Sequence, residues 1–131
     1  MADDKEMKRM EPILIKRIYD PANNNDGYRI LVDRLWPRGI SKEKALLDEW
    51  MKDIAPSPAL RKWFDHQEKR FATFRSDYQM ELLTDPVKNE LLHQILEKAA
   101  TKNVTLLYAA KDPHINHAVV LLETLLQQRK S

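Results

Sequence analysis

Residues 28–39 are YRILVDRLWPRG, a short apolar run followed directly by a charged loop. The run Ile30-Leu31-Val32 shows no polar alternation, which is typical of a β-strand covered on both faces. Residues 104–110, VTLLYAA, repeat this pattern and are followed by Lys111 and Asp112. The long, helix-patterned segment between the two runs favours a right-handed crossover that joins parallel neighbouring strands.

A third strand is predicted over residues 13–19, ILIKRIY, where Asp20-Pro21 stops it. The short loop from there to residue 28 favours antiparallel pairing of this strand with residues 28–32. Residues 1–11 show no periodicity and are expected to form a mobile tail. We therefore expect an α/β fold over residues 12–131, with a small, mainly parallel three-stranded sheet covered by helices in a single domain.

Capping residues and apolar stripes predict the helices. Ser41 is the expected N-cap of a helix over residues 42–54, and Ser57-Pro58 and Asp85-Pro86 each indicate a further helix start. Apolar stripes at helical spacing follow, and each predicts a buried helix face. The stripes are Leu47, Trp50, Met51 and Ile54; Phe71, Phe74, Tyr78 and Leu82; Leu91, Leu92, Ile95, Leu96 and Ala99; and Leu121, Leu122, Leu125 and Leu126.

Composition excludes several classes of function. The chain of 131 residues has no cysteine, which rules out disulfides, thiol nucleophiles and cysteine-ligated metals within it. Two glycines cannot build a Walker A or GxGxxG loop. A net charge of +2 gives no argument for nucleic-acid binding, and no apolar run is long enough to cross a bilayer. We expect a cytoplasmic protein that needs no cofactor, with nucleic acid and membrane both unlikely partners.

The two loops that follow the parallel strands are the predicted site. Ligands of open α/β sheets bind outside the carboxyl ends of the strands, so residues 33–39 and 111–117 are expected to converge there. Arg34, Arg38, Lys111 and Asn116 are the predicted ligand-binding residues, because cations beside a helix N-terminus suit an anion. The predicted acid–base residues are Asp33, Asp112 and His117.

Structural roles compete with these assignments. Asp33 and Arg34 could form ion pairs, Asp112-Pro113 could cap a helix, and packing in the core is the expected role of Trp36. His114 and His117 have the spacing of two metal ligands, but no third ligand has comparable spacing, so no metal site is expected. Tyr78 lies on an apolar stripe, so its hydroxyl needs a buried partner, for which an arginine or a carboxylate is predicted.

Several segments spread over most of the chain form a recognisable set: IKRIYDP (15–21), DGYRILVDRLWPRGISKEKA (26–45), KDIAPS (52–57), LRKWFDH (60–66), Tyr78 with Glu81-Leu82, TLLYAAKD (105–112) and NHA (116–118). Together they resemble the YeaO-like family of small bacterial proteins, a branch of a large family of domains of unknown function. The resemblance implies a compact α/β protein and supplies no reaction. Longer branches of the family carry a Cys-His pair near the place of Asn116-His117, and this chain lacks the cysteine.

Two functions from different classes follow. The first is a protein with a pocket for an anionic small molecule at the carboxyl ends of the strands, which leaves open whether it is an enzyme. The second is a regulatory module that binds nucleic acid or protein. A concave, partly apolar cleft holding both loops would favour the first, and a continuous Lys/Arg face would favour the second.

Overall fold

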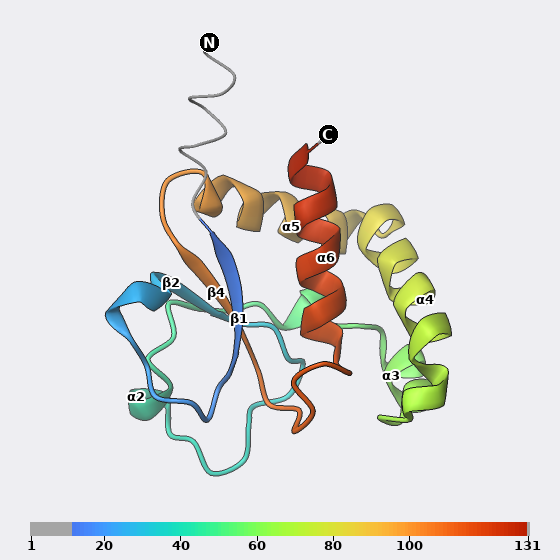
Figure 1. Ribbon diagram of the computed structural model, residues 1–131, viewed down its shortest axis with the longest axis horizontal. Coiled ribbons are helices and arrows are strands. Elements are labelled where there is room, and N and C mark those ends of the chain that lie inside the picture. Colours follow the sequence, from blue (N-terminus) through green and yellow to red (C-terminus); the bar gives the residue numbers. More distant parts are fainter. Residues whose placement is uncertain (1–11, 131) are drawn as a thin grey trace.

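A four-stranded parallel sheet is the centre of the computed structural model, which describes residues 12–130 (Figure 1). Strands β1 (Ile13–Arg17), β2 (Tyr28–Leu31), β3 (Glu49–Trp50) and β4 (Val104–Tyr108) lie in the order β1-β4-β2-β3. β2 and β4 are parallel neighbours, as predicted. The tail predicted over residues 1–11 lies outside the described residues.

The predicted antiparallel pairing of the first two strands is wrong. β1 pairs in parallel with β4, with Ile13 opposite Val104, and β4 separates β1 from β2. Every residue of β4 is buried, because this strand has neighbours on both sides and helices or loops over both faces. The connection from β1 to β2 carries the 3-10 helix η1 (Asn24–Asp26) in place of a hairpin turn.

Gly27 makes this connection compatible with β4. Its φ is +65°, and a Cβ atom at this position would lie 2.3 Å from the carbonyl oxygen of Asn103. The next residue, Tyr28, donates its backbone N–H to that same oxygen at 2.8 Å. Only glycine allows the backbone to approach so closely at positive φ.

The predicted helix over residues 42–54 is also wrong, although Ser41 is the N-cap. Helix α2 (Lys42–Ala45) ends at Leu46, whose φ is +50°, and the chain continues into β3 and the 3-10 helix η2 (Lys52–Ile54). Residues 49 and 50 pair with Ile30 and Leu31, so they add a fourth strand to the three that were predicted. A short strand followed by a 3-10 turn buries Met51 and Ile54 as effectively as a helix would.

The other predicted helices are confirmed. Ser57 caps α3 (Pro58–Phe64), Asp85 caps α5 (Pro86–Ala99), and each helix has proline in its first turn. Phe74, Tyr78 and Leu82 are the buried stripe of α4 (Phe71–Thr84), which follows the 3-10 helix η3 (Glu68–Arg70). The last helix is α6 (His117–Lys130). No helix within residues 12–130 has the length and apolar character needed to cross a membrane.

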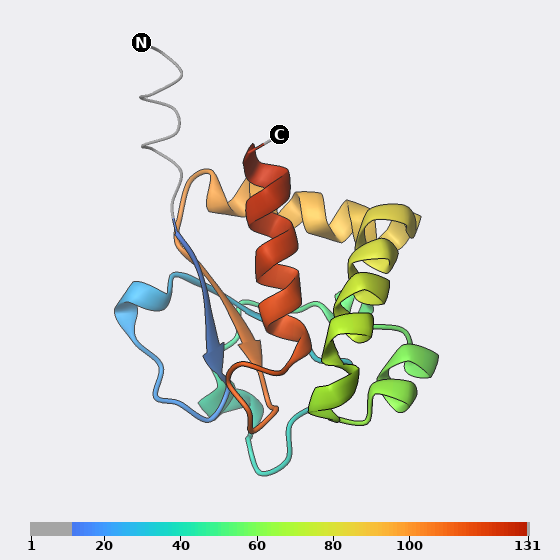
Figure 2. The ribbon, with the colours of Figure 1, turned by 45° about the vertical axis from the view of Figure 1, so that its right-hand side comes forward.

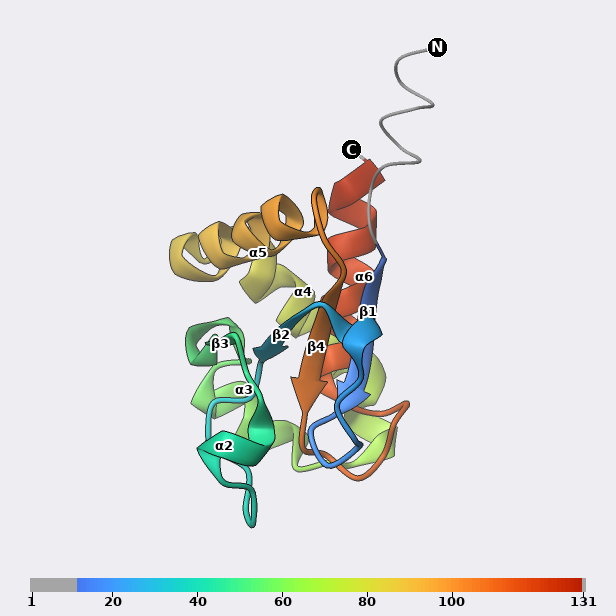
Figure 3. The ribbon, with the colours of Figure 1, turned by 90° about the vertical axis from the view of Figure 1, so that its left-hand side faces the viewer.

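The sheet separates two apolar cores. Ile30, Val32 and Leu106 belong to the larger core beneath α4, α5 and α6, and Leu31 and Leu107 belong to the smaller core beside α2. Figure 2 shows α6 beside β1 with α4 next to it, and Figure 3 shows α2 near the lower end of the sheet. Neighbouring residues of one strand therefore enter opposite cores, which explains the continuous apolar runs.

Candidate functional site

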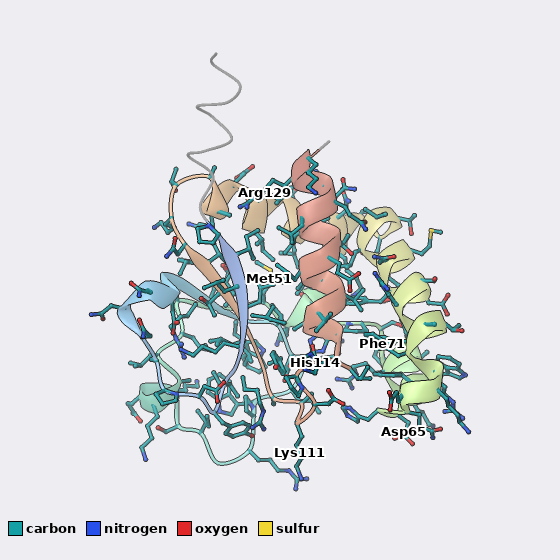
Figure 4. The ribbon with its side chains drawn as sticks, in the orientation of Figure 1. Met51, Asp65, Phe71, Lys111, His114 and Arg129 are labelled. Atoms are coloured by element: carbon teal, nitrogen blue, oxygen red, sulfur yellow. The ribbon has the colours of Figure 1, made fainter. Side chains whose placement is uncertain are left out.

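The carboxyl ends of β1, β2 and β4 meet at one edge of the sheet, because all three strands are parallel. We call the last residue of β1 and the segments that follow the three strands, together residues 17–20, 33–40 and 109–117, the carboxyl edge. Figure 4 shows Lys111 at this edge, with its side chain directed away from the body of the protein, and His114 nearer to the start of α6. The two segments of the predicted site thus leave adjacent strands at the same end of the sheet.

Asp33 connects these two segments. Its Oδ2 accepts the backbone N–H of Ala109 at 3.0 Å, and its Oδ1 lies 3.2 Å from Nε2 of His117. The same Nε2 lies 3.1 Å from the carbonyl oxygen of Val32. Both neighbours of Nε2 are acceptors, so this nitrogen carries the proton. Two of the three predicted acid–base residues are therefore in contact, and both side chains are mostly buried.

Asp112 and Asn116 shape the turn that leads into α6. Asp112 Oδ1 accepts the backbone N–H groups of His114 and Ile115, and these two hydrogen bonds lower the pKa of the Asp112 carboxyl group. Asn116 Nδ2 donates to the carbonyl oxygen of Asp112, and its Oδ1 accepts the N–H of Val119 in the first turn of α6. The polar groups of both side chains thus make hydrogen bonds within this segment.

The three predicted cations are less restrained. Arg34 lies 4.0 Å from Asp53, and both side chains are well exposed. Arg38 and Lys111 are exposed and form no ion pair with any residue from 12 to 130. The backbone of Arg38 is held, because the hydroxyl group of Tyr19 donates to its carbonyl oxygen at 2.9 Å.

Arg17 is a residue of the carboxyl edge that sequence reasoning missed. Its Nε donates to the carbonyl oxygen of Ala110 at 2.9 Å, a second guanidinium nitrogen donates to Ala109, and the group lies over the ring of Tyr19. An antiparallel β1 would have placed Arg17 at the opposite edge. The available signal was the charged side chain at the end of an apolar strand, the same signal that identified the other two segments.

Two aromatic residues support the loop after β2. Trp36 packs against the smaller core, as predicted, and donates its indole N–H to the carbonyl oxygen of Ile40. The rings of Trp50 and Trp36 form a T-shaped contact, and Trp50 donates its indole N–H to the carbonyl oxygen of Asp33 at 2.8 Å. These bonds fix the backbone of the loop at both ends.

The hydrogen-bond partner of Tyr78 is a backbone carbonyl group and not the predicted arginine or carboxylate side chain. Its hydroxyl group donates to the backbone carbonyl of Ile54 at 2.7 Å, and neither an arginine nor a carboxylate accepts or donates there. The ring is fully buried and lies edge-on to His117. Burial raises the pKa of Tyr78 well above its ordinary value.

Two surface clefts lie away from the predicted site. One, of about 580 Å³, lies between α5 and the β2–β3 side of the sheet, and its lining includes Ile30, Met51 and Ile95. The other is a shallow groove of about 700 Å³ between α3 and α4, lined in part by Leu60 and Trp63. Neither lining includes a residue of the carboxyl edge, so neither cleft is the partly apolar cleft holding both loops that would favour an anion pocket. Among residues 12–130, no three His, Asp or Glu side chains are grouped closely enough to hold a metal ion.

The family assignment follows from the sequence comparison. Residues 12–131 match the family described as "Inactive DUF488-N3 subclade". The chain belongs to this inactive DUF488-N3 subclade. The match covers every described element of the DUF488-N3 chain, including all three segments of the carboxyl edge.

Relatives of this DUF488-N3 protein occur in distant bacteria. It is 50% identical to YeaO of Escherichia coli (strain K12) over 113 residues, which cover 86% of this chain and 96% of YeaO. It is 38% identical over 119 residues to Rv3073c of Mycobacterium tuberculosis (strain H37Rv) and to Mb3100c of Mycobacterium bovis, covering 91% of this chain and 98% of each relative. No solved structure shows significant similarity to it. The resemblance to YeaO-like proteins is confirmed.

Proposed function

We propose that this protein binds an anionic small molecule at the carboxyl edge, without acting on it chemically. The observation that carries the proposal is the pair of exposed cations, Arg38 and Lys111, which lack ionic partners among the described residues. They belong to loops that leave adjacent parallel strands at the same end of the sheet. Charge-assisted hydrogen bonds from such groups suit phosphate and carboxylate ligands.

The hydrogen bonds of the predicted acid–base residues support positioning roles for these side chains. Asp33 Oδ2 accepts the N–H of Ala109, Asp33 Oδ1 is buried without a hydrogen-bond partner among the described residues, and Asp112 Oδ1 accepts two backbone N–H groups. His117 Nε2 is directed at Val32 and Asp33. Each of these contacts holds its side chain in place, which supports positioning roles. The description of the family as inactive agrees with a role in binding.

Titration with inorganic phosphate, pyrophosphate and citrate, followed by isothermal calorimetry, tests the proposal. We expect Arg38→Gln and Lys111→Gln each to weaken binding about tenfold, since each removes a charge-assisted contact worth about 1.5 kcal/mol. Lys62→Gln is the matched control, because Lys62 is an exposed cation on α3, outside the carboxyl edge. The proposal fails if none of the three anions binds, or if all three variants weaken binding equally.

A further inference from the structure

β1 leaves one side of the sheet open. Val104 donates its backbone N–H to Pro12, and Ile18 donates to Tyr108, so alternate backbone groups of β1 face β4. The intervening residues, Ile13, Ile15 and Arg17, direct their backbone N–H groups away from the sheet. Figures 1 and 2 show no described helix or strand in front of this edge, and Figure 3 shows β1 outermost in the sheet.

The charged side chains of β1 do not protect this edge. Exposed lysine and arginine commonly block edge strands from pairing with other chains. Here Lys16 forms an ion pair with Asp26 at 3.1 Å, and Arg17 donates to carbonyl groups at the end of β4. Leu14 is the exposed side chain of the strand, at 45%. The edge thus combines unpaired backbone groups with an exposed apolar residue.

Helix α6 adds an apolar flank beside the open edge. Glu123 of α6 forms an ion pair with Arg75 of α4, which fixes the side of α6 that faces α4. Leu122 and Leu126 lie one turn apart on a stripe rotated away from that side, and Leu126 is 38% exposed. Figures 1 and 2 show α6 between β1 and α4, so the side of α6 turned away from α4 is the side toward β1.

We propose that a second copy of this chain pairs with β1 and forms a twofold-symmetric dimer with a continuous eight-stranded sheet. A twofold axis requires the two β1 strands to run antiparallel. The register that pairs all three outward-facing residues places Ile15 opposite Ile15 of the second copy and Ile13 opposite its Arg17. In this register each outward N–H group of one strand meets a carbonyl group of the other.

Charge and helix direction are consistent with the same arrangement. The two α6 helices would run antiparallel beside the axis, so their dipoles oppose one another favourably. Lys130 lies at the C-terminal end of α6, and the exposed Asp112 lies in the loop that precedes α6. In the dimer, Lys130 of one copy would approach Asp112 of the other copy. The low pKa of Asp112 keeps that carboxylate negatively charged at neutral pH.

Sedimentation equilibrium of the full chain tests this proposal. We expect twice the chain mass of 15.5 kDa, and we expect Leu126→Lys to raise the dissociation constant of the dimer about tenfold to a hundredfold. Met80→Lys is the matched control, because Met80 is an exposed apolar residue on α4, away from β1. It should leave the dimer unchanged.

Backbone hydrogen exchange separates loss of pairing from loss of folding. The amide of Ile15 should be protected in the wild type and in Met80→Lys, and it should exchange rapidly in Leu126→Lys while the amides of β4 stay protected. Ile15→Pro removes the same outward N–H group without removing a hydrogen bond to β4, and it should also yield a monomer. A monomeric wild type, or a dimer that survives both interface variants, overturns the proposal.

Discussion

Replacing Asp26 with asparagine should destabilise the protein more than any single surface change. Asp26 Oδ2 lies 2.5 Å from the guanidinium group of Arg29, and each of these side chains is only 7% exposed. Asp26 also accepts from Lys16 of β1 and from the backbone N–H of Asn23. Arg29 in turn donates to carbonyl groups at the end of α2. This cluster therefore joins β1, β2 and α2.

The magnitude follows from the charge left behind. Removing one partner of a buried ion pair typically costs about 3–5 kcal/mol, because the other charge stays buried without compensation. The carbonyl partners of Arg29 and the partial exposure of Lys16 favour the lower end, so we expect about 3 kcal/mol for Asp26→Asn. A domain of this size has about 5–15 kcal/mol in total, so the variant should remain folded with clearly reduced stability.

Urea unfolding followed by tryptophan fluorescence measures this change. Asp77→Asn is the matched control, because Asp77 is an exposed aspartate on α4, and surface substitutions usually change stability by less than about 0.5 kcal/mol. We expect a lower midpoint with an unchanged slope for Asp26→Asn alone. If its midpoint matches that of Asp77→Asn, the cluster does not hold the three elements together.

Three further results are expected. Burial tends to raise the pKa of Asp26, but hydrogen bonds from Asn23, Lys16 and Arg29 outweigh this effect and lower the pKa overall. The contribution of Asp26 to stability should therefore be full above about pH 4 and decrease as the pH falls through the folded-state pKa. Urea midpoints of the wild type should decline more steeply in acid than those of Asp26→Asn. Tyr78→Phe should cost about 1–3 kcal/mol in thermal unfolding, since it leaves a buried carbonyl group unpaired, and an unchanged melting temperature would contradict this. Asp33→Ala should increase the hydrogen exchange rate of the backbone amide of Ala109. An exchange rate equal to that of the wild type would show that Asp33 does not restrain the loop after β4.

The sequence predicted the burial of the strands more accurately than their order in the sheet. The continuous apolar runs of β2 and β4 indicated strands covered on both faces, and their parallel pairing located the carboxyl edge. The position of β4 between β1 and β2 depends on contacts between residues far apart in the chain, which local patterns do not encode. That error led us to miss Arg17, because the direction of β1 decides at which end of the sheet Arg17 lies.

The predicted helix over residues 42–54 was wrong at residues 47–54 for a different reason. Apolar residues spaced three and one apart fit one face of a helix, but they fit equally well a two-residue strand followed by a 3-10 turn. Pairing with Ile30 and Leu31 favours the strand, and the positive φ of Leu46 ends the preceding helix. The capping pairs Ser57-Pro58 and Asp85-Pro86 were reliable, because the hydrogen bonds of a cap involve only residues adjacent in sequence.

The late position of β4 in the chain has a consequence for how the protein is made. During synthesis β1 and β2 leave the ribosome long before residues 104–108, and each then lacks its main partner strand. A nascent chain that ends before β4 can pair only β2 with β3. The protein could therefore be divided into two fragments, the second of which is a C-terminal peptide containing β4 and α6. This peptide would insert between β1 and β2 of the first fragment, so folding would report directly on the association of the two fragments.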